Sequence, residues 1–373
     1  MENPFKNIIN LFFSNKGDSV LGIDIGSSAI KLVQLRKKGG KAVLETYGEI
    51  SLGPYAGFEI GRSTNLNEDK VSEALRDLIG ESNVTTKACA VSIPVGASLV
   101  TFIKLPKSAE KQLDTLVPIE ARKYIPVQIS EVSLNWWVVP EEKNNPSEFQ
   151  SDTAETPDTS IDIFLAVIHN DAIERNRNIM KAVGLESSFL EIELFSDIRS
   201  SLDQSLQPQI VLDMGASSTK LYIVERGILR NSHVINRGSQ DITIAVSKSM
   251  GLSFEEAERM KRTYGIASGA SEKDLTDITS LTLEYIFSES SRVLLSYQKK
   301  YNKNVSKVVL TGGGVNLKGI VDYAKKMLQT ECVIANPFDK LEFPAFLDNV
   351  LQSAGPEFSV AIGIALRELQ EME

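Results

Sequence analysis

Two stretches of the sequence place an aspartate, a glycine and several hydroxyl side chains between apolar runs. They read GIDIGSSAIKLVQL at residues 22–35 and VLDMGASSTKLYIV at residues 211–224, so one lies in each half of the chain. Alignment of the two stretches pairs Asp24 with Asp213, Gly26 with Gly215, Ser28 with Ser217, and Lys31 with Lys220. One such stretch predicts only a hairpin, because turns are rich in Asp and Gly. Its repetition predicts two similar domains with equivalent hairpins that face each other.

These hairpins have the chemistry of a polyphosphate-binding site. Gly26 and Gly215 permit a positive φ and close approach of the backbone to a ligand. Turn amides and hydroxyl groups donate hydrogen bonds to phosphate oxygens. The candidate donors are Ser27, Ser28, Ala216, Ser217, Ser218 and Thr219. Lys31 would neutralise phosphate charge. Because a carboxylate repels a bare phosphate, Asp24 and Asp213 predict a divalent cation, Mg²⁺ or Mn²⁺, next to a bound nucleotide.

Two further stretches fit the rest of a nucleotide. LTGGGVNLKG (310–319) predicts a strand, a glycine turn and a helix start, whose backbone would lie flat against a base or an α-phosphate. Its candidate residues are Gly312, Gly313, Gly314 and Leu317. In AERMKRTYG (257–265), Glu258, Lys261 and Arg262 fall on one helix face and would bind a ribose and cover a base. The alternative for that face is a solvated run of charges.

A possible catalytic carboxylate lies in FLEIELF (189–195), where Glu191 and Glu193 precede a predicted helix. A carboxylate at this point would orient a water near the γ-phosphate, and Glu193 is the candidate. The alternative is that both are ordinary surface carboxylates.

The elements that must position these residues are strands and helices in alternation. Apolar runs predict strands at 20–25, 30–36, 42–50, 87–93, 98–104, 132–139, 161–168, 210–215, 219–225, 228–236 and 307–314. Helical stripes predict helices at 68–80, 171–184, 240–250, 274–300, 317–329 and 359–369. Gly80 is expected to end the first of these helices in a left-handed conformation. Ser253 and Glu256 form a capping box that starts another helix. The fold class is therefore α/β.

Composition narrows the function. The chain has 373 residues, which suggests two or more domains. Its formal net charge of −9 excludes nucleic acid as a general partner. Two His and two Cys leave little room for a His- or Cys-based metal site or a disulfide framework. Residues 1–18 carry one apolar helical face, typical of either a docked tail or an amphipathic element for a membrane surface or partner.

Together these motifs resemble the actin-like ATPase superfamily, which includes actin, sugar kinases, chaperone ATPases and the cell-division protein FtsA. GIDIGSSAIK resembles its first phosphate hairpin, VLDMGASSTK its second, and LTGGG its adenosine motif. The resemblance implies a duplicated, ribonuclease H-like two-domain fold that binds ATP and a divalent ion. It also places Glu193 in the first connecting segment. Gly238 stands alone, followed by Ser239, where relatives have a glycine pair.

EARKYIP, SEVSLNWWVV and AERMKRTYG resemble the PilM family of type IV pilus assembly. This resemblance implies a first actin-like domain of residues 19–102, 188–207 and 355–373, an extra FtsA/PilM-type subdomain of residues 103–187, and a second actin-like domain of residues 208–354. It implies a cytoplasmic protein that reaches the inner face of the inner membrane through partners. Those partners are an N-terminal peptide of a PilN-like membrane protein, bound beside the extra subdomain, and the pilus motor complex.

Three functions remain open from the sequence. The first is a nucleotide-dependent adaptor of pilus assembly or related type II secretion, at most a slow ATPase. The second is a small-molecule kinase on the same fold, although no polar cluster for a sugar stands outside the hairpins. The third is an FtsA-like tether that self-associates into polymers and lies peripherally on the membrane. The acidic end RELQEME disfavours this tether.

Overall fold

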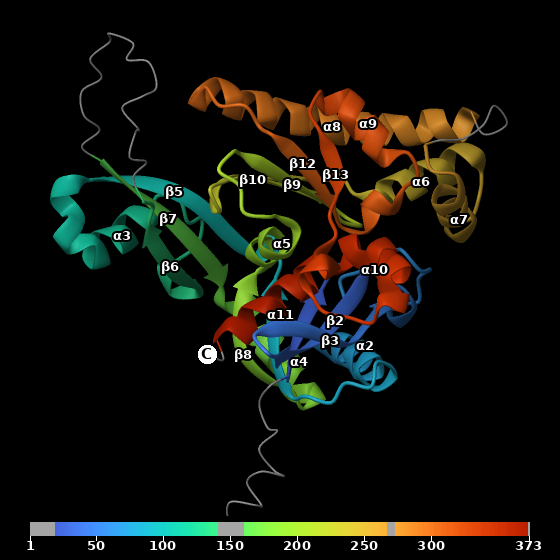
Figure 1. The fold of residues 1–373 in the computed structure, drawn as a ribbon, viewed down its shortest axis with the longest axis horizontal. Helices are drawn as coiled ribbons and strands as arrows, with labels where there is room; N and C mark the ends of the chain where they lie inside the picture. The colour runs from blue at the N-terminus through green and yellow to red at the C-terminus, as the bar shows by residue number, and fades with distance from the viewer. Residues whose placement is uncertain (1–18, 141–159, 267–272, 372–373) are drawn as a thin grey trace, which may run out of the picture. The chain divides into compact units, whose positions relative to one another are not determined.

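The computed structural model describes residues 19–140, 160–266 and 273–371 (Figure 1). The described residues form two compact units, one up to Ser92 and from Asn176 onward, the other Ile93–Arg175. The tail predicted at 1–18 lies outside the described residues. The unit Ile93–Arg175 overlaps the expected extra subdomain 103–187, whose boundaries stay a prediction.

The larger unit contains two five-stranded sheets with equivalent topology. The first has the order β3-β2-β1-β4-β8 and the second the order β11-β10-β9-β12-β13. The first consists of β1 (Ser19–Ile25), β2 (Ala29–Lys38), β3 (Lys41–Ser51), β4 (Ala88–Ile93) and β8 (Glu186–Ile192). The second consists of β9 (Gln209–Met214), β10 (Thr219–Glu225), β11 (Ile228–Ile235), β12 (Lys307–Thr311) and β13 (Cys332–Ile334). In each sheet an antiparallel meander is followed by a parallel neighbour, β4 beside β1 and β12 beside β9. This arrangement confirms the predicted duplicated α/β fold of the actin-like type.

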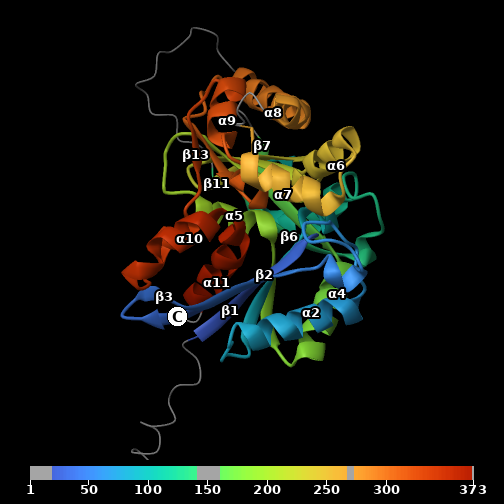
Figure 2. The ribbon, with the colours of Figure 1, turned by 90° about the vertical axis from the view of Figure 1, so that its right-hand side faces the viewer.

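Helices cover both faces of these sheets, which explains the continuous apolar runs of strands such as the fully buried β9. The helices are α2 (Glu68–Glu81), α4 (Asn170–Val183), α5 (Glu193–Ser201), α6 (Ser239–Met250), α7 (Phe254–Tyr264), α8 (Lys273–Tyr301), α9 (Ile320–Leu328), α10 (Asp348–Ala354) and α11 (Ser359–Glu371). Residues of α6, α8 and α9 form one core on the second sheet, and α2 and α4 form another on the first. In both views α5 and α11 lie between the two sheets (Figure 2).

Helix α11 packs closely against both α5 and β1 because glycines lie at the contacts. A Cβ on Gly363 of α11 would overlap the carbonyl group of Ser196 in α5. A Cβ on Gly22 of β1 would overlap the carbonyl oxygen of Ala361 and lie 2.8 Å from the Cβ of Ala365. This close packing fixes the start of α5, and therefore Glu193, relative to both sheets.

Three predicted boundaries were wrong. Helix α2 runs to Glu81, so Gly80 lies inside it, and Asn83 takes the left-handed conformation with φ of 51° instead. The expected strand 307–314 ends at Thr311, and the helix expected from 317 begins at Ile320. Between them the chain forms a 3-10 turn at Gly313–Asn316. The triple glycine therefore does not lie at the start of an α-helix.

The unit Ile93–Arg175 is a small α/β unit. Its antiparallel sheet has the order β5 (Ser98–Pro106), β7 (Ser160–His169), β6 (Val132–Val138). Helix α3 (Leu113–Ala121) packs on one face of the sheet. The aromatic ring of Phe164 in β7 packs against the rings of Phe102 in β5 and Trp137 in β6.

Short 3-10 helices complete the described part of the chain: η1 (Pro54–Ala56), η2 (Val95–Ala97), η3 (Lys107–Gln112), η4 (Ile129–Glu131), η6 (Gly313–Asn316), η7 (Pro337–Lys340), η8 (Ala345–Leu347) and η9 (Gly355–Phe358). No helix within the described ranges is both long enough and apolar enough to cross a membrane.

Candidate nucleotide-binding site

The two predicted hairpins have the same local geometry. In the β1–β2 turn, Gly26 N donates to Ala29 O at 3.0 Å, and in the β9–β10 turn, Gly215 N donates to Ser218 O at 3.0 Å. Neither glycine has a positive φ, so the conformational reason expected for them was wrong. Glycine instead allows close approach, because an added Cβ would lie 3.0 Å from the same carbonyl oxygen in each turn.

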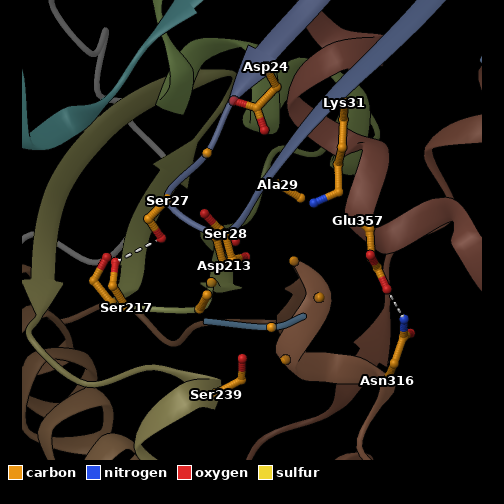
Figure 3. A pocket seen from close by; sticks show the side chains of 18 of the residues that line it. Asp24, Ser27, Ser28, Ala29, Lys31, Asp213, Ser217, Ser239, Asn316 and Glu357 are labelled. Atoms are coloured by element: carbon orange, nitrogen blue, oxygen red, sulfur yellow. Dashed lines mark hydrogen bonds between the residues drawn. The ribbon is translucent and has the colours of Figure 1, made fainter. Parts of the chain in front are cut away.

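The two hairpins face each other across one cavity. Ser217 Oγ donates to Ser27 Oγ at 3.2 Å, which joins the tips of the hairpins (Figure 3). The structure brings most of the predicted residues to this cavity: Asp24, Gly26, Ser27, Ser28, Lys31, Glu193, Asp213, Gly215, Ala216, Ser217, Ser218, Glu258, Lys261, Arg262, Gly312, Gly313, Gly314 and Leu317. Residues far apart in the sequence thus form a single site.

Two predicted residues do not line the cavity. Thr219 is fully buried, and its hydroxyl donates to Arg237 O at 2.9 Å. A Cβ on Gly238 would overlap Ala216 O and lie 2.7 Å from Gly215 O. Gly238 therefore lets the start of α6 pack against the second hairpin. There the amide of Ser239 donates to Gly215 O at 2.9 Å. Thr219 and Gly238 therefore contribute to the packing of the second hairpin and not to the lining of the cavity.

Lys220 links two of the predicted carboxylates. Its Nζ lies 2.8 Å from Glu193 Oε2 and 3.0 Å from Asp213 Oδ2. Burial opposes the charge of Lys220, but Asp213 and Glu193 outweigh it and raise the pKa of Lys220 well above its usual value. Burial also raises the pKa of Glu193, although the neighbouring Lys220 acts against this shift. Lys220 is thus a charged lysine that bridges β9 and the start of α5.

Asp24 has a different environment. Its Oδ1 accepts a hydrogen bond from Ser92 Oγ at 2.7 Å, and the side chain lines the cavity. Among the residues that the structure describes, no group of three or more His, Cys, Asp and Glu side chains could hold a metal ion. The Asp24 and Asp213 carboxylates at the cavity fit Mg²⁺ bound in its usual way, by one or two carboxylates together with phosphate oxygens and water. Asp24 is available for this role, whereas Asp213 is shared with Lys220.

The three glycines of LTGGG are not equivalent. Gly312 has φ of 84° and ψ of 166°, and an added Cβ would overlap Asp213 Oδ1 and lie 2.7 Å from Met214 O. A Cβ on Gly314 would lie 2.8 Å from Met214 O. At Gly313 the nearest atom to an added Cβ is Glu357 Cδ at 3.6 Å. Two of the glycines are therefore required by packing on β9, and Gly313 alone presents free space to the cavity.

The charged face of α7 is partly buried rather than solvated. Lys261 Nζ lies 2.6 Å from Glu258 Oε2, and Arg262 Nε lies 2.7 Å from Glu258 Oε1. Thr243 also donates to Glu258. Burial would raise the pKa of Glu258, but Lys261 and these hydrogen bonds lower it overall. Burial lowers the pKa of Lys261. The Arg262 side chain is 66% exposed, so its guanidinium lies at the mouth of the cavity.

The cavity is also lined by Glu49, Asn316 and Glu357, which were not predicted from the sequence. Lys31 Nζ lies 3.6 Å from Glu49 Oε1, and Asn316 Nδ2 donates to Glu357 (Figure 3). Burial raises the pKa of Glu357, with Lys31 acting against it and Glu49 adding to it. No sequence motif marks Glu49 or Glu357. Lys220, by contrast, was detectable as the counterpart of Lys31 in the repeat.

Glu191 is structural. Its carboxylate accepts hydrogen bonds from Arg199 at 2.7 and 2.8 Å, from Arg367 at 3.0 Å and from Ser196 at 2.6 Å. These bonds join β8, α5 and α11. Glu193, the glutamate of FLEIELF that was predicted to orient a water, does line the cavity.

Comparison with known proteins decides the family. The family described as "Type IV pilus assembly protein PilM" matches residues 22–369 of this chain. The chain belongs to this family. PilM proteins are thus its relatives, and the resemblance found in EARKYIP and the two hairpins is confirmed.

Curated relatives include FtsA cell-division proteins. The FtsA of Neisseria meningitidis is 26% identical over 230 residues, which cover 56% of this chain and 54% of that protein. The FtsA of Bacillus subtilis is 24% identical over 173 residues, which cover 41% of this chain and 37% of that protein. This chain therefore spans about half the length or less of these curated relatives.

Solved structures share the fold. A PilM–PilN type IV pilus biogenesis complex aligns with a TM-score of 0.77 and 24% identity, covering 94% of this chain and 98% of that one. MreB5 of Spiroplasma citri bound to AMPPNP aligns with a TM-score of 0.52 and 10% identity, covering 94% and 96%. These alignments confirm the actin-like fold of this PilM-family chain.

Proposed function

We propose that this PilM-family protein is an ATP-binding adaptor of type IV pilus assembly or of related type II secretion. The cavity between the hairpins holds ATP with Mg²⁺ (or Mn²⁺). A second surface binds the N-terminal peptide of a PilN-like inner-membrane protein. In this proposal the protein works in the cytoplasm, at the inner face of the inner membrane, and connects that partner to the pilus motor complex.

The observation that carries the nucleotide proposal is the pair of equivalent hairpins at one cavity. Their tips meet at Ser27 and Ser217, 3.2 Å apart. Residues of both hairpin turns thus line the same space, where their hydroxyls and backbone amides would meet the acceptors on several sides of a polyphosphate. Lys31 adds a positive charge from the first hairpin. A ligand here would contact both sheets at once.

The remaining residues fit the other parts of ATP. Asp24 would hold the ion with phosphate oxygens and water. Gly313 would lie against the adenosine, because it has no side chain that could fill that space. The planar guanidinium of Arg262 would cover the base, and Glu258 would accept from the ribose. Bound Mg²⁺ would supply charge neutralisation of the phosphates.

The loop after η1 supports a role in coupling the two halves. Ser63 N donates to Gln240 Oε1 of α6 at 3.0 Å, and the Arg62 guanidinium lies 4.5 Å from the ring centre of Phe254 at the start of α7. These contacts join the loop between η1 and α2 to the helices α6 and α7, which pack on the second sheet. A nucleotide that binds both sides would shift the balance between open and closed forms, and so alter partner binding.

The partner proposal rests on family membership and on the solved relative described as a PilM–PilN complex. That relative assembles with PilN, and we extend this to a PilN-like partner of the present chain. Self-association, expected from the resemblance to FtsA, stays a prediction. Glu193 is proposed as the residue that orients a water, which would make the protein at most a slow ATPase.

The nucleotide proposal is tested by isothermal titration of Mg-ATP into the wild-type protein, Asp24→Ala and Asp213→Ala. Loss of a metal-binding carboxylate should weaken binding about tenfold or more for Asp24→Ala, and Asp213→Ala should weaken it as well. Asp162→Ala, at an exposed position of β7, is the matched control and should bind as wild type. Wild-type affinity in both cavity variants would refute the clamp.

The partner proposal is tested by fluorescence anisotropy with a labelled N-terminal peptide of a PilN-like protein, with and without Mg-ATP. Saturable binding, changed by nucleotide, is the expected result. A scrambled peptide is the control. Absence of binding in both conditions would reject the adaptor and favour a small-molecule kinase on the same fold.

A further inference from the structure

Lys220 is placed where a cation is needed in the proposed site. It is the counterpart of Lys31, since Lys220 pairs with Asp213 across β9 and β10 as Lys31 pairs with Asp24 across β1 and β2. Both lysine side chains are 15% exposed and line the cavity. Their partners differ, however, because Lys31 Nζ contacts Glu49 and Lys220 Nζ contacts the carboxylates of Asp213 and Glu193.

The contacts of Lys220 satisfy the carboxylates that a divalent ion would otherwise share. Its ammonium lies 2.8 Å from Glu193 and 3.0 Å from Asp213, and both carboxylate side chains are 9% exposed. Two buried carboxylates repel each other and require a nearby positive charge. In this site the chain supplies that charge itself, at the end of the second hairpin beside the position of the phosphates.

We propose that Lys220 is a built-in counter-cation for Asp213 and Glu193, which takes the place of a metal ion on the Asp213 side of the site and holds Glu193 in an ion pair that limits its action on water. This inference rests on the proposed ATP site and refines it. Metal, when present, is held on the Asp24 side, while Lys220 occupies the Asp213 side. A glutamate held in an ion pair is a poor acceptor for a proton from water. The adaptor would therefore turn ATP over slowly at most.

The proposal separates two carboxylates that the repeat makes equivalent. Asp24→Ala removes the carboxylate that faces the metal. Asp213→Ala instead leaves Lys220 free to approach the phosphates. We therefore expect Asp213→Ala to weaken Mg-ATP binding less than Asp24→Ala does.

The decisive experiment compares ATP affinity in MgCl₂ with ATP affinity in EDTA by isothermal titration, for the wild type, Lys220→Gln and Lys220→Arg. The ratio of the two dissociation constants measures metal dependence. We expect the ratio for Lys220→Gln to be about tenfold higher than the ratio for the wild type and for Lys220→Arg, because Asp213 and Glu193 then lack their cation and need the metal ion to offset their repulsion of the phosphates. Lys31→Gln is the matched control and should weaken binding in both buffers with the wild-type ratio.

A second measurement uses Mn²⁺ alone as the probe, detected by electron paramagnetic resonance without nucleotide. Lys220→Gln should bind Mn²⁺ more tightly than the wild type, because Asp213 and Glu193 are then released to the ion. If Lys220→Gln does not fold, the double variant Lys220→Gln/Glu193→Gln takes its place, because it removes one buried carboxylate together with the lysine. It should show the same increase in metal dependence through Asp213.

The outcomes distinguish this inference from the proposed function. Equal ratios for the wild type and Lys220→Gln, with ATP bound by both proteins, overturn the role of Lys220 and leave the ATP site standing. An equal rise in metal dependence for Lys31→Gln also overturns it, because any cavity lysine would then have the same effect. A wild type that binds no ATP in either buffer refutes the proposed function itself.

Discussion

Replacement of Gly312 by alanine tests whether the glycine turn is required by the protein's own packing. Gly312 has φ of 84° and ψ of 166°, a backbone region that is essentially restricted to glycine. An added Cβ would also overlap Asp213 Oδ1 and lie 2.7 Å from Met214 O. The substitution therefore strains the turn and displaces a residue of the proposed ATP site at the same time.

The magnitude follows from these two terms. Backbone strain of this kind costs about 1–3 kcal/mol, and overlap in a packed region costs a similar amount. Partial relaxation would leave a net loss of about 2–4 kcal/mol for Gly312→Ala. For a unit of this size, that loss corresponds to a decrease in melting temperature of roughly 3–7 °C.

The neighbouring glycine provides the control. Gly313 has no positive φ, and an added Cβ would meet nothing closer than 3.6 Å. Gly313→Ala should change the melting temperature little but weaken ATP binding, since the methyl group points into the cavity. Thermal unfolding by circular dichroism measures the first effect and titration calorimetry the second. If Gly312→Ala melts at the same temperature as Gly313→Ala, the packing explanation is wrong.

Two further predictions concern stability. In α11, Gly363→Ala should lower the free energy of unfolding by about 2 kcal/mol or more, because its Cβ would overlap the Ser196 carbonyl. The same change at Gly80 in α2, where an added Cβ meets nothing within 4 Å, should raise it by about 0.5–1 kcal/mol; equal denaturation midpoints for the two variants would contradict this. Burial, with a contribution from Asp213, raises the pKa of Asp197 to about 7. The native state then keeps a proton that the unfolded state loses above about pH 4, so wild-type stability decreases as the pH rises from about 4 to 7. Asp197→Asn should therefore gain stability relative to the wild type between about pH 5 and pH 8, and a difference independent of pH would exclude this origin.

Much of the site was predictable because it is built from local patterns. A hairpin forms between neighbouring strands, so Asp24 and its counterpart in the second half could be located from their own surroundings. The capping box at Ser253 likewise predicted the start of α7, where Ser253 Oγ accepts from Glu256 N at 3.2 Å. Repetition of one pattern in each half then predicted that the hairpins belong to one site.

Other features depend on contacts between distant segments. The triple glycine was interpreted through a ligand, but Gly312 and Gly314 pack against β9, which lies about a hundred residues earlier in the chain. Glu357 comes from η9 and lines the same cavity as Lys31. No local spacing connects these residues, because their proximity results from the packing of both sheets around α5 and α11.

The sequence by itself determined the repeated hairpins, the elements that carry them and the family to which the chain belongs. These depend on residue types over short spacings, where backbone geometry and hydrophobic periodicity act directly. Only the tertiary structure decided what each charged group does. Lys220 could be aligned with Lys31 from the sequence. The structure shows that their partners differ, because α5 brings Glu193 Oε2 within 2.8 Å of Lys220 Nζ, whereas Lys31 Nζ lies 3.6 Å from Glu49 Oε1. The charge of a buried group depends on its neighbours in space, and those neighbours are set by packing.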